Sequence, residues 1–472
     1  MAADTEKLGS ATMAELQGMV DAAARASGAV GAQVSVIVGD RRSDFVYGSA
    51  NAELNIPMTV DTVTQVGSVT KVFNAALIVA LAEEGKVGLD VPVVKYIPDL
   101  KLADERAQNT VTLRQLLSMS SGLDNGPYKP LKGLNALAEY VSGLRDIPQV
   151  FPPGTGYGYS NAGICVAGYV AQKVTGEAWD TLIRERIFEP AGLQHAITLA
   201  EDLPYFRVSV GHLPAQNGKA ATVLRPWYIS QGMGPAGSTL AMSAHDLASF
   251  GQIFVNGGKA GNGTRVLSET AVKTMMTPTT DVPIAVPVWG VGDKWGLGPN
   301  MSKWGDKVVW GHAGGNRSGV SQLLWLPERH AVLAFVLNTP GALDGFSTRM
   351  FGGFSQAVFG VSGPKLSPPD PPLHVAEPKR FVGTYVRYGM RYEITAEADR
   401  LHYKQINLGL GTPGEVLGVL IEGDLISLGG DRFMVKIPAV PDGGLPLAFF
   451  GRDSAGRALN LVDPMFAARR VD

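Results

Sequence analysis

A serine and a lysine, Ser68 and Lys71, stand three residues apart at the start of a mostly apolar segment that runs to Ala82. The segment predicts a helix that ends near Gly85, and residues three apart on a helix lie on one face with their side chains close enough to meet. An apolar helix is usually buried on all sides, so we expect the Lys71 amine to be partly desolvated, with a lowered pKa that lets it accept a proton. Free backbone N–H groups at the helix N-terminus also favour the negative charge that forms when a serine attacks a carbonyl. The pair therefore predicts a serine nucleophile with a lysine base.

The spacing alone does not decide the chemistry. Ser362 and Lys365 repeat the same Ser-x-x-Lys pattern, but Pro364 prevents a helix there and no apolar shell follows. Taken alone, Ser68 and Lys71 also fit a polar helix cap followed by a lysine whose amine reaches solvent. Other motifs are needed to separate these two interpretations.

Two glycine-rich segments add further polar side chains. Within residues 151–161, Tyr159 and Asn161 point the same way if the segment is extended, which gives one phenol for proton transfer and one amide for a substrate carbonyl. Within residues 308–316, His312 lies on a predicted strand whose glycines let a ligand approach the backbone. Considered singly, these residues also fit structural roles: a helix cap after a packed aromatic ring, and a buried, hydrogen-bonded histidine.

Taken together in their chain order, the Ser-x-x-Lys, Tyr-x-Asn and His-x-Gly motifs that begin at Ser68, Tyr159 and His312 resemble one superfamily. It is that of the serine β-lactamases and penicillin-binding proteins, in the branch of class C β-lactamases, family VIII esterases and D-aminopeptidases. The chain is also similar to penicillin-binding-protein-type thioesterases. The resemblance includes residues 112–123 and covers roughly residues 30–340.

The resemblance implies a role for each residue. Ser68 is expected to be the nucleophile that carries the acyl group, and Lys71 and Tyr159 the proton-transfer pair. Asn161 is expected to bind a substrate amide, and the backbone N–H groups of Ser68 and Gly315 to form the oxyanion hole. Losing one such donor typically costs about 10² to 10³ in turnover. The resemblance implies no cofactor and no metal.

The last strand departs from the β-lactamase pattern. His312 and Gly314 stand where β-lactamases and carboxypeptidases usually have Lys-Thr-Gly, whose lysine meets a substrate carboxylate. A histidine of ordinary pKa is mostly neutral at pH 7 and anchors an anion poorly, which disfavours β-lactam hydrolysis as the main activity. In a second departure, Met119 stands where relatives commonly have a histidine, and we assign no catalytic role to this change.

Three functions fit this set of residues. The leading one is a serine hydrolase that forms an acyl-enzyme on Ser68 and cleaves an ester or amide. The second is a penicillin-binding-protein-type thioesterase that releases and macrocyclises a nonribosomal peptide by acyl transfer to an amine; a carrier protein would then be a partner. The third is a non-catalytic acyl-binding sensor that becomes acylated and stalls. Each would take a small-molecule or peptide ester, amide or thioester.

Composition excludes several other classes. The 472 residues are 45% hydrophobic and 18% charged, as in a globular protein, and 41 basic against 43 acidic residues give no support for nucleic-acid binding. One cysteine, Cys165, allows neither an internal disulfide nor a thiolate zinc cluster. Because the first residues are polar and no apolar stretch approaches the roughly 20 residues that span a bilayer, we expect no membrane partner and a cytoplasmic location.

The elements that must position the site begin and end with strands. A hairpin is expected over residues 32–38 and 45–47. Later strand patterns cover residues 307–310, 319–326 and 331–337. Helical patterns lie between, among them residues 113–119, 162–175, 180–188 and 244–255. This order predicts an α/β (α+β), β-lactamase-like catalytic domain in which both ends supply an antiparallel sheet flanked by helices.

A proline-rich stretch predicts a domain boundary. Residues 1–365 are expected to form the catalytic domain, 366–378 a linker, and 379–472 a small C-terminal antiparallel, lipocalin-like β-barrel. The strand-like runs of the barrel are residues 381–388, 391–396, 401–406, 416–421, 425–428, 433–437 and 447–450. No candidate for chemistry lies beyond Val375, so we expect the barrel to influence substrate range more than chemistry.

Overall fold

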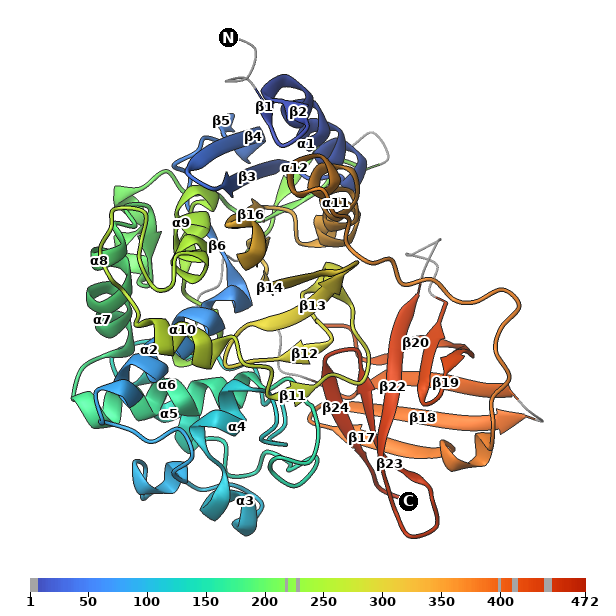
Figure 1. Ribbon diagram of the computed structural model, residues 1–472. Coiled ribbons are helices and arrows are strands. Elements are labelled where there is room, and N and C mark those ends of the chain that lie inside the picture. Colours follow the sequence, from blue (N-terminus) through green and yellow to red (C-terminus); the bar gives the residue numbers. More distant parts are fainter. Residues whose placement is uncertain (1–6, 217–219, 226–229, 398–399, 410–414, 437–443) are drawn as a thin grey trace.

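The structure, a computed structural model, describes residues 7–216, 220–225, 230–397, 400–409, 415–436 and 444–472. Within these ranges a large α/β part holds a nine-stranded antiparallel sheet, and a closed eight-stranded antiparallel barrel follows it (Figure 1). Both halves of the predicted fold class are therefore confirmed.

The large sheet draws its strands from both ends of the α/β part. Strands β3 (Gly31–Val38) and β4 (Arg41–Asn51) form the expected hairpin, and β3 pairs with β16 (Ala331–Leu337). The sheet continues through β15 (Val320–Leu326) to β14 (Lys307–Gly315), in the order β11-β12-β13-β14-β15-β16-β3-β4-β5. The other strands of this part are β1 (Lys7–Leu8), β2 (Ala11–Thr12), β5 (Ile56–Pro57), β6 (Thr64–Gln65), β7 (Ala196–Ile197), β8 (His212–Leu213), β9 (Thr222–Val223), β10 (Ala241–Met242), β11 (Thr280–Asp281), β12 (Lys294–Trp295) and β13 (Asn300–Trp304).

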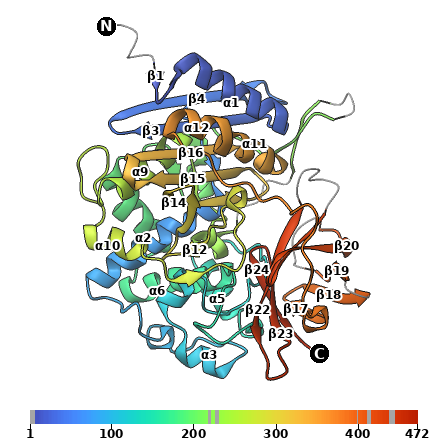
Figure 2. The same cartoon turned by 45° about the vertical axis from the view of Figure 1, so that its right-hand side comes forward.

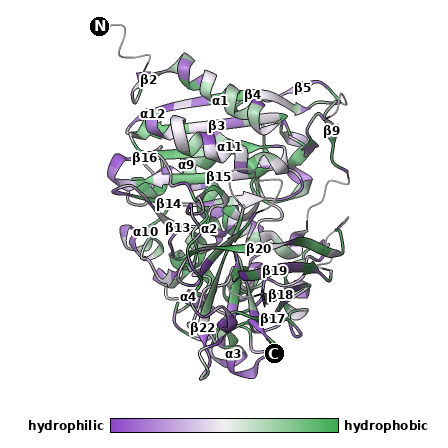
Figure 3. Cartoon of the chain, turned by 90° about the vertical axis from the view of Figure 1, so that its right-hand side faces the viewer, coloured by the Kyte–Doolittle hydropathy of each residue, from purple (hydrophilic) through white to green (hydrophobic). Residues whose placement is uncertain are grey.

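Helices cover both faces of this sheet (Figure 2). Every side chain of β16 is buried because alternate residues enter two different cores, which explains its uninterrupted apolar sequence. Leu333 and Phe335 belong to the core that α1 (Met13–Ser27) closes. Val332 and Val336 belong to the core of α2 (Thr70–Glu83) and α9 (Ala244–Val255). The outer helix α1 carries both hydrophobic and hydrophilic residues along its length, as expected for a helix with one buried face (Figure 3).

The helices expected from the sequence are present with small differences. Residues 244–255 form one helix, whereas residues 180–188 form a short α-helix that continues as one turn of π-helix, Arg184–Phe188. The remaining helix bounds are α2 (Thr70–Glu83), α3 (Glu105–Thr110), α4 (Leu113–Leu117), α5 (Ala136–Ser142), α6 (Asn161–Thr175), α7 (Trp179–Ile183), α8 (Glu189–Ala191), α9 (Ala244–Val255), α10 (Glu269–Met275), α11 (Leu343–Arg349) and α12 (Ser355–Phe359).

The C-terminal barrel closes between its first and last strands. Strand β17 pairs with both β18 and β24, so the sheet has no open edge at that point. Buried aromatic rings, among them Tyr385, Tyr403 and Phe449, form its core. The strands are β17 (Gly383–Arg387), β18 (Met390–Glu397), β19 (Arg400–Asn407), β20 (Gly418–Gly429), β21 (Arg432–Val435), β22 (Leu445–Arg452), β23 (Ala458–Asp463) and β24 (Phe466–Arg470).

Three details of the barrel differ from the expected strands. The runs at 416–421 and 425–428 belong to one long strand, β20, because Gly423 is accommodated within its ladder. Strands β23 and β24 were not predicted. The run at 433–437 ends at a residue outside the described ranges.

A stretch of irregular structure joins the two parts. Residues 361–377 form neither helix nor strand, and the expected boundaries at 365 and 378 fall in or next to this stretch. No helix in the described ranges is long and apolar enough to cross a bilayer.

The barrel packs directly on the α/β part. The rings of Phe151 and Phe450 meet edge to face with centroids 5.6 Å apart, and the Asn460 side-chain amide donates to the Val150 carbonyl over 3.1 Å. The backbone N–H of Tyr388 donates to Asp124 Oδ2 over 2.7 Å. Polar and apolar contacts from several strands thus hold the barrel against the loops of residues 122–125 and 149–158.

Asp124 provides a test of this interface. Its carboxylate is 3% exposed and interacts with the buried guanidinium of Arg387. Asp124→Ala leaves the Tyr388 N–H without its acceptor and that guanidinium without a nearby carboxyl group, so the free energy of unfolding should fall by about 1 to 3 kcal/mol. Proteolysis within residues 361–377 should also accelerate.

The measurements are thermal unfolding and limited proteolysis, with Asp146→Ala as the control because Asp146 is an exposed acid in the same region. Equal stability and equal cleavage of the Asp124 and Asp146 variants would contradict the assigned role of Asp124.

Candidate active site

Ser68 and Lys71 lie where a turn of 3₁₀-helix, Gly67–Val69, continues into α2. The Lys71 amine donates a hydrogen bond to Ser68 Oγ over 3.0 Å and another to the Ala236 carbonyl over 2.5 Å. The lysine side chain is fully buried, as the apolar sequence of this helix predicts. The two residues therefore meet in the geometry expected of them.

Burial determines the protonation of Lys71. Desolvation lowers its pKa to about 7, because a charged ammonium is disfavoured away from water. The nearby thiol of Cys165 does not compensate, since burial raises the pKa of Cys165 to about 12 and keeps it neutral. At neutral pH a substantial fraction of the Lys71 amine can thus accept a proton.

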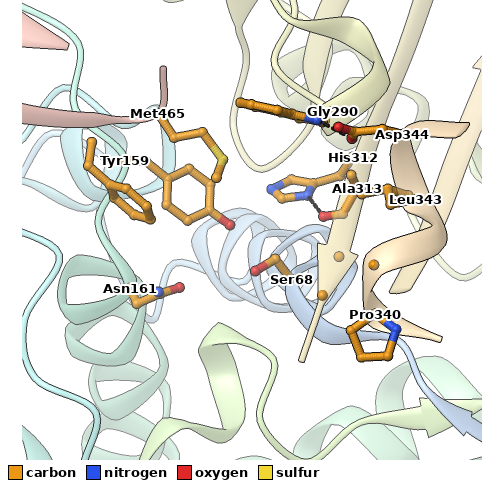
Figure 4. A pocket seen from close by; sticks show the side chains of 15 residues that line it. Ser68, Tyr159, Asn161, Gly290, His312, Ala313, Pro340, Leu343, Asp344 and Met465 are labelled. Atoms are coloured by element: carbon orange, nitrogen blue, oxygen red, sulfur yellow. Dashed lines mark hydrogen bonds between the residues drawn. The ribbon is translucent and has the colours of Figure 1, made fainter. Parts of the chain in front are cut away.

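Tyr159 approaches the same serine from another segment. It lies in the loop before α6, and its hydroxyl is close enough to Ser68 to interact with it. Its ring lies under the Lys71 amine, with 4.8 Å between the nitrogen and the ring centroid. Burial raises the pKa of Tyr159, so the phenol is protonated at neutral pH. Figure 4 shows the Tyr159 hydroxyl directed toward Ser68 and His312.

The end of β14 lies against the turn that carries Ser68, and two glycines permit this contact. Gly67 has a φ of +58°, and a Cβ added there would lie 2.4 Å from Gly315 N. A Cβ added at Gly314 would lie 1.9 Å from the Val66 carbonyl oxygen and 2.8 Å from Ser68 N. The backbone nitrogens of Ser68 and Gly315 therefore belong to two segments in close contact beside the serine hydroxyl.

His312, on β14, is buried and uncharged. Its Nδ1 interacts with the Ala313 carbonyl, and its Nε2 has no hydrogen-bond partner among the described residues. Burial, with a smaller contribution from Lys71, lowers the pKa of His312 to about 3. The histidine therefore supplies no cation at the position where β-lactamases have a lysine.

A pocket of about 480 Å³ opens above these groups. Ser68, Tyr159, Asn161, His312, Gly314 and Gly315 all line it, so the structure brings the expected residues to one cavity. Lys71 lies behind Ser68, outside the lining. Asn161 begins α6, and Figure 4 places its side chain facing Ser68 from the side opposite β14.

The barrel also contributes to this pocket. Met465 and Phe466, at the turn between β23 and β24, line the pocket. The Met465 carbonyl accepts a hydrogen bond from Tyr159 N over 3.0 Å, and the Phe466 ring packs edge to face on Tyr159. These contacts give the barrel a way to influence substrate range, and the expectation that it affects range more than chemistry stays a prediction. The turn between β23 and β24 reaches back to the tyrosine loop, and no motif marks it in the sequence.

Trp289 and Asp344 also line the pocket without having been predicted. They come from a 3₁₀ turn, Pro287–Trp289, and from α11, and the indole N–H of Trp289 donates to Asp344 Oδ1. In the described ranges no group of three or more His, Cys, Asp or Glu residues is arranged to hold a metal ion.

Met119 supports the tyrosine loop from below. It has a φ of +58°, uncommon for a residue with a side chain, and its carbonyl accepts a hydrogen bond from Gly158 N over 2.9 Å. Its side chain is fully buried. Its contribution to the site is through its backbone.

The depressed pKa of Lys71 predicts how stability depends on pH. Between about pH 7 and 10.5 the unfolded chain holds a proton that folded Lys71 lacks, so the free energy of unfolding should rise with pH across this window. Below pH 7 both states are protonated and the penalty, of the order of 3 to 5 kcal/mol, is complete. Lys71→Met should therefore remove this part of the pH slope, and its stability relative to the unmodified chain should be greatest below pH 7.

Denaturant unfolding at several pH values measures the slope. Lys86→Met is the control, because the Lys86 side chain is 41% exposed, and it should leave the slope unchanged. A Lys71→Met protein with the same slope as the unmodified chain would contradict the depressed pKa.

Comparison with known proteins agrees with this geometry. The β-lactamase family model matches residues 16–351. Penicillin-binding protein 4 of Amycolatopsis lactamdurans is 30% identical over 370 residues, which cover 76% of this chain and 93% of that protein. Esterase EstB of Burkholderia gladioli is 30% identical over 204 residues, covering 38% of this chain and 50% of the esterase.

Two solved structures have a fold similar to that of this chain. The crystal structure of SurE superposes with a TM-score of 0.79 at 24% identity and covers 97% of this chain and 98% of SurE. The D-amino acid amidase of Ochrobactrum anthropi SV3, complexed with L-phenylalanine amide, superposes with a TM-score of 0.60 at 25% identity, covering 71% of this chain and 95% of the amidase. Because the family model matches most of the length of this chain, the chain belongs to the β-lactamase family, within the superfamily that includes the penicillin-binding proteins.

Proposed function

We propose that this chain is a serine hydrolase that forms an acyl-enzyme on Ser68 and cleaves an ester or amide. The observation that carries the proposal is the position of the Ser68 hydroxyl, which accepts a hydrogen bond from the Lys71 amine and interacts with the Tyr159 phenol. With a pKa of about 7, the Lys71 amine suits a general base at neutral pH. The esterase and amidase named among its relatives support the same class of reaction.

Acylation in this proposal follows from the positions of the groups. Lys71 Nζ takes the proton of Ser68 Oγ as the oxygen attacks the substrate carbonyl carbon. The carbonyl oxygen becomes negatively charged and accepts hydrogen bonds from the backbone N–H groups of Ser68 and Gly315. The tetrahedral intermediate collapses with cleavage of the bond to the leaving group, which takes a proton from Tyr159, and the phenolate recovers a proton from the Lys71 ammonium. Water then repeats the sequence on the acyl-enzyme, which releases the acid.

The remaining residues favour neutral over anionic substrates. Asn161 can hold an amide of the acyl group through its side chain. His312, uncharged at pH 7, gives no anchor for the carboxylate of a β-lactam. We therefore propose that β-lactam hydrolysis is not the main activity.

Acyl transfer to an amine, as in a peptide-cyclising thioesterase, is the second candidate. The observation in its favour is the apolar wall that Met465 and Phe466 add to the pocket, because a less hydrated pocket lets a bound amine compete with water for the acyl-enzyme. The same Ser68, Lys71 and Tyr159 would serve, with the amine in place of water. A carrier protein would then deliver the acyl group.

Removal of the nucleophile tests the leading proposal. Ser68→Ala should lower the hydrolysis of p-nitrophenyl esters by at least about 10³-fold and abolish any acyl adduct visible by intact mass. Ser362→Ala is the matched control, since Ser362 lies in the second Ser-x-x-Lys sequence, is exposed, and has Gln356 as its hydrogen-bond partner rather than a lysine. Its activity and adduct should equal those of the unmodified chain. Full activity in Ser68→Ala would refute the assignment.

A peptidyl thioester with a free N-terminal amine separates the three functions. The hydrolase is expected to give mostly free acid with many turnovers, measured by liquid chromatography and mass spectrometry. A majority of cyclic amide would instead establish the acyltransferase. A stable adduct on Ser68 with no turnover would indicate the sensor.

A further inference from the structure

The lining of the active-site pocket contains few ionisable groups. Three of the described lining residues can ionise: Tyr159, His312 and Asp344. Burial keeps the first two neutral at pH 7, since it raises the pKa of Tyr159 and lowers that of His312. Asp344 is half-buried; burial raises the pKa of its carboxyl group, and the hydrogen bond from Trp289 acts in the opposite direction. Asp344 is therefore the one described lining residue with a carboxyl group, and none of the three is a cation at pH 7.

The environment of Asp344 leaves one carboxylate oxygen available. The indole N–H of Trp289 donates to Oδ1, which fixes the orientation of the carboxylate. Among the described residues, Oδ2 has neither a hydrogen-bond donor nor a cation as a partner. Figure 4 places Asp344 across the pocket from Tyr159 and Asn161, on the far side of Ser68. A ligand atom bound there would lie at the opposite end of the pocket from the tyrosine.

We propose that Asp344 is a specificity residue that binds a primary ammonium group of the substrate. This inference rests on the proposed function and names a substrate class for it. An ammonium has three N–H donors and can bind Oδ2 in a charge-assisted hydrogen bond, which is stronger than a bond between neutral groups. The neutral His312 offers no competing cation. The ammonium can belong to the acyl group or to the leaving group, and the two sources need separate tests.

Two substrate pairs distinguish these sources. In the first, D- or L-alanine p-nitroanilide carries the ammonium on the acyl side, and its N-acetyl derivative does not. In the second, the butyrate ester of 4-(aminomethyl)phenol carries it on the leaving group, and the 4-(acetamidomethyl)phenol ester does not. The unmodified chain is expected to prefer the ammonium substrate in at least one pair by about 10- to 100-fold in kcat/KM, the range expected for one hydrogen bond between charged groups.

Asp344→Asn removes the charge and keeps an oxygen that can accept from Trp289. It should abolish the preference, because kcat/KM falls more for the ammonium substrate than for its acetylated partner. Thermal unfolding checks that the variant is folded. Asp306→Asn is the control for net charge, because that side chain is 82% exposed and outside the pocket lining. It should retain the preference.

The inference is overturned if the unmodified chain shows no preference in either pair, or if Asp344→Asn lowers both members of a pair equally. Binding without turnover separates this result from a failure of the proposed hydrolase function. Benzylammonium should bind the unmodified chain at least tenfold more tightly than benzyl alcohol, by ligand-observed NMR, and Asp344→Asn should remove the difference. Equal binding of the two probes would refute the ammonium site even in a chain that hydrolyses none of the substrates.

Discussion

The site depends on the burial of one amine. Lys71 stands on a helix whose other buried residues are mostly apolar, and it reaches Ser68 and the Ala236 carbonyl without contact with water. A fully buried ammonium would need a counter-charge, and here the balance is met instead by a pKa near neutrality. In the proposed mechanism, the energetic penalty of placing a lysine in a core is the property that lets its amine activate the serine beside it. The rest of the fold keeps that amine dry and holds its partners in reach.

Three separate segments meet at this amine, and each has its own support. The glycines at 67 and 314 let β14 lie against the serine turn, so that two backbone amides can serve one oxyanion. The tyrosine loop is held from one side by the Met119 carbonyl and from the other by the Met465 carbonyl. Backbone contacts, and not side chains alone, hold these segments in position. The site can therefore be assembled from parts of the chain that are far apart in sequence.

The sequence predicted the reactive centre better than its walls. Ser68, Lys71, Tyr159 and His312 occur in short motifs, where spacing along one helix or loop already determines which side chains share a face. The β16 hydrophobic run and the hairpin of β3 and β4 were equally local signals. By contrast, Asp344, Trp289, Met465 and Phe466 reach the pocket only because distant elements pack together, and single residues in such places carry no pattern. The same limit explains the barrel, where β20 was divided at Gly423 and the last two strands, which have no marked alternation, were missed.

The hydrogen bond between the Tyr159 amide and the Met465 carbonyl has an evolutionary consequence. In this chain the C-terminal module contributes backbone support to the segment that carries Tyr159, so the module is not an independent appendage. Recombination that replaces the β23–β24 turn would at once reshape the substrate cavity and shift the tyrosine. Diversification of specificity in proteins with this architecture should therefore concentrate at the tip of that turn, where a few substitutions alter the cavity while the amide contact, which any residue type can supply, is inherited unchanged.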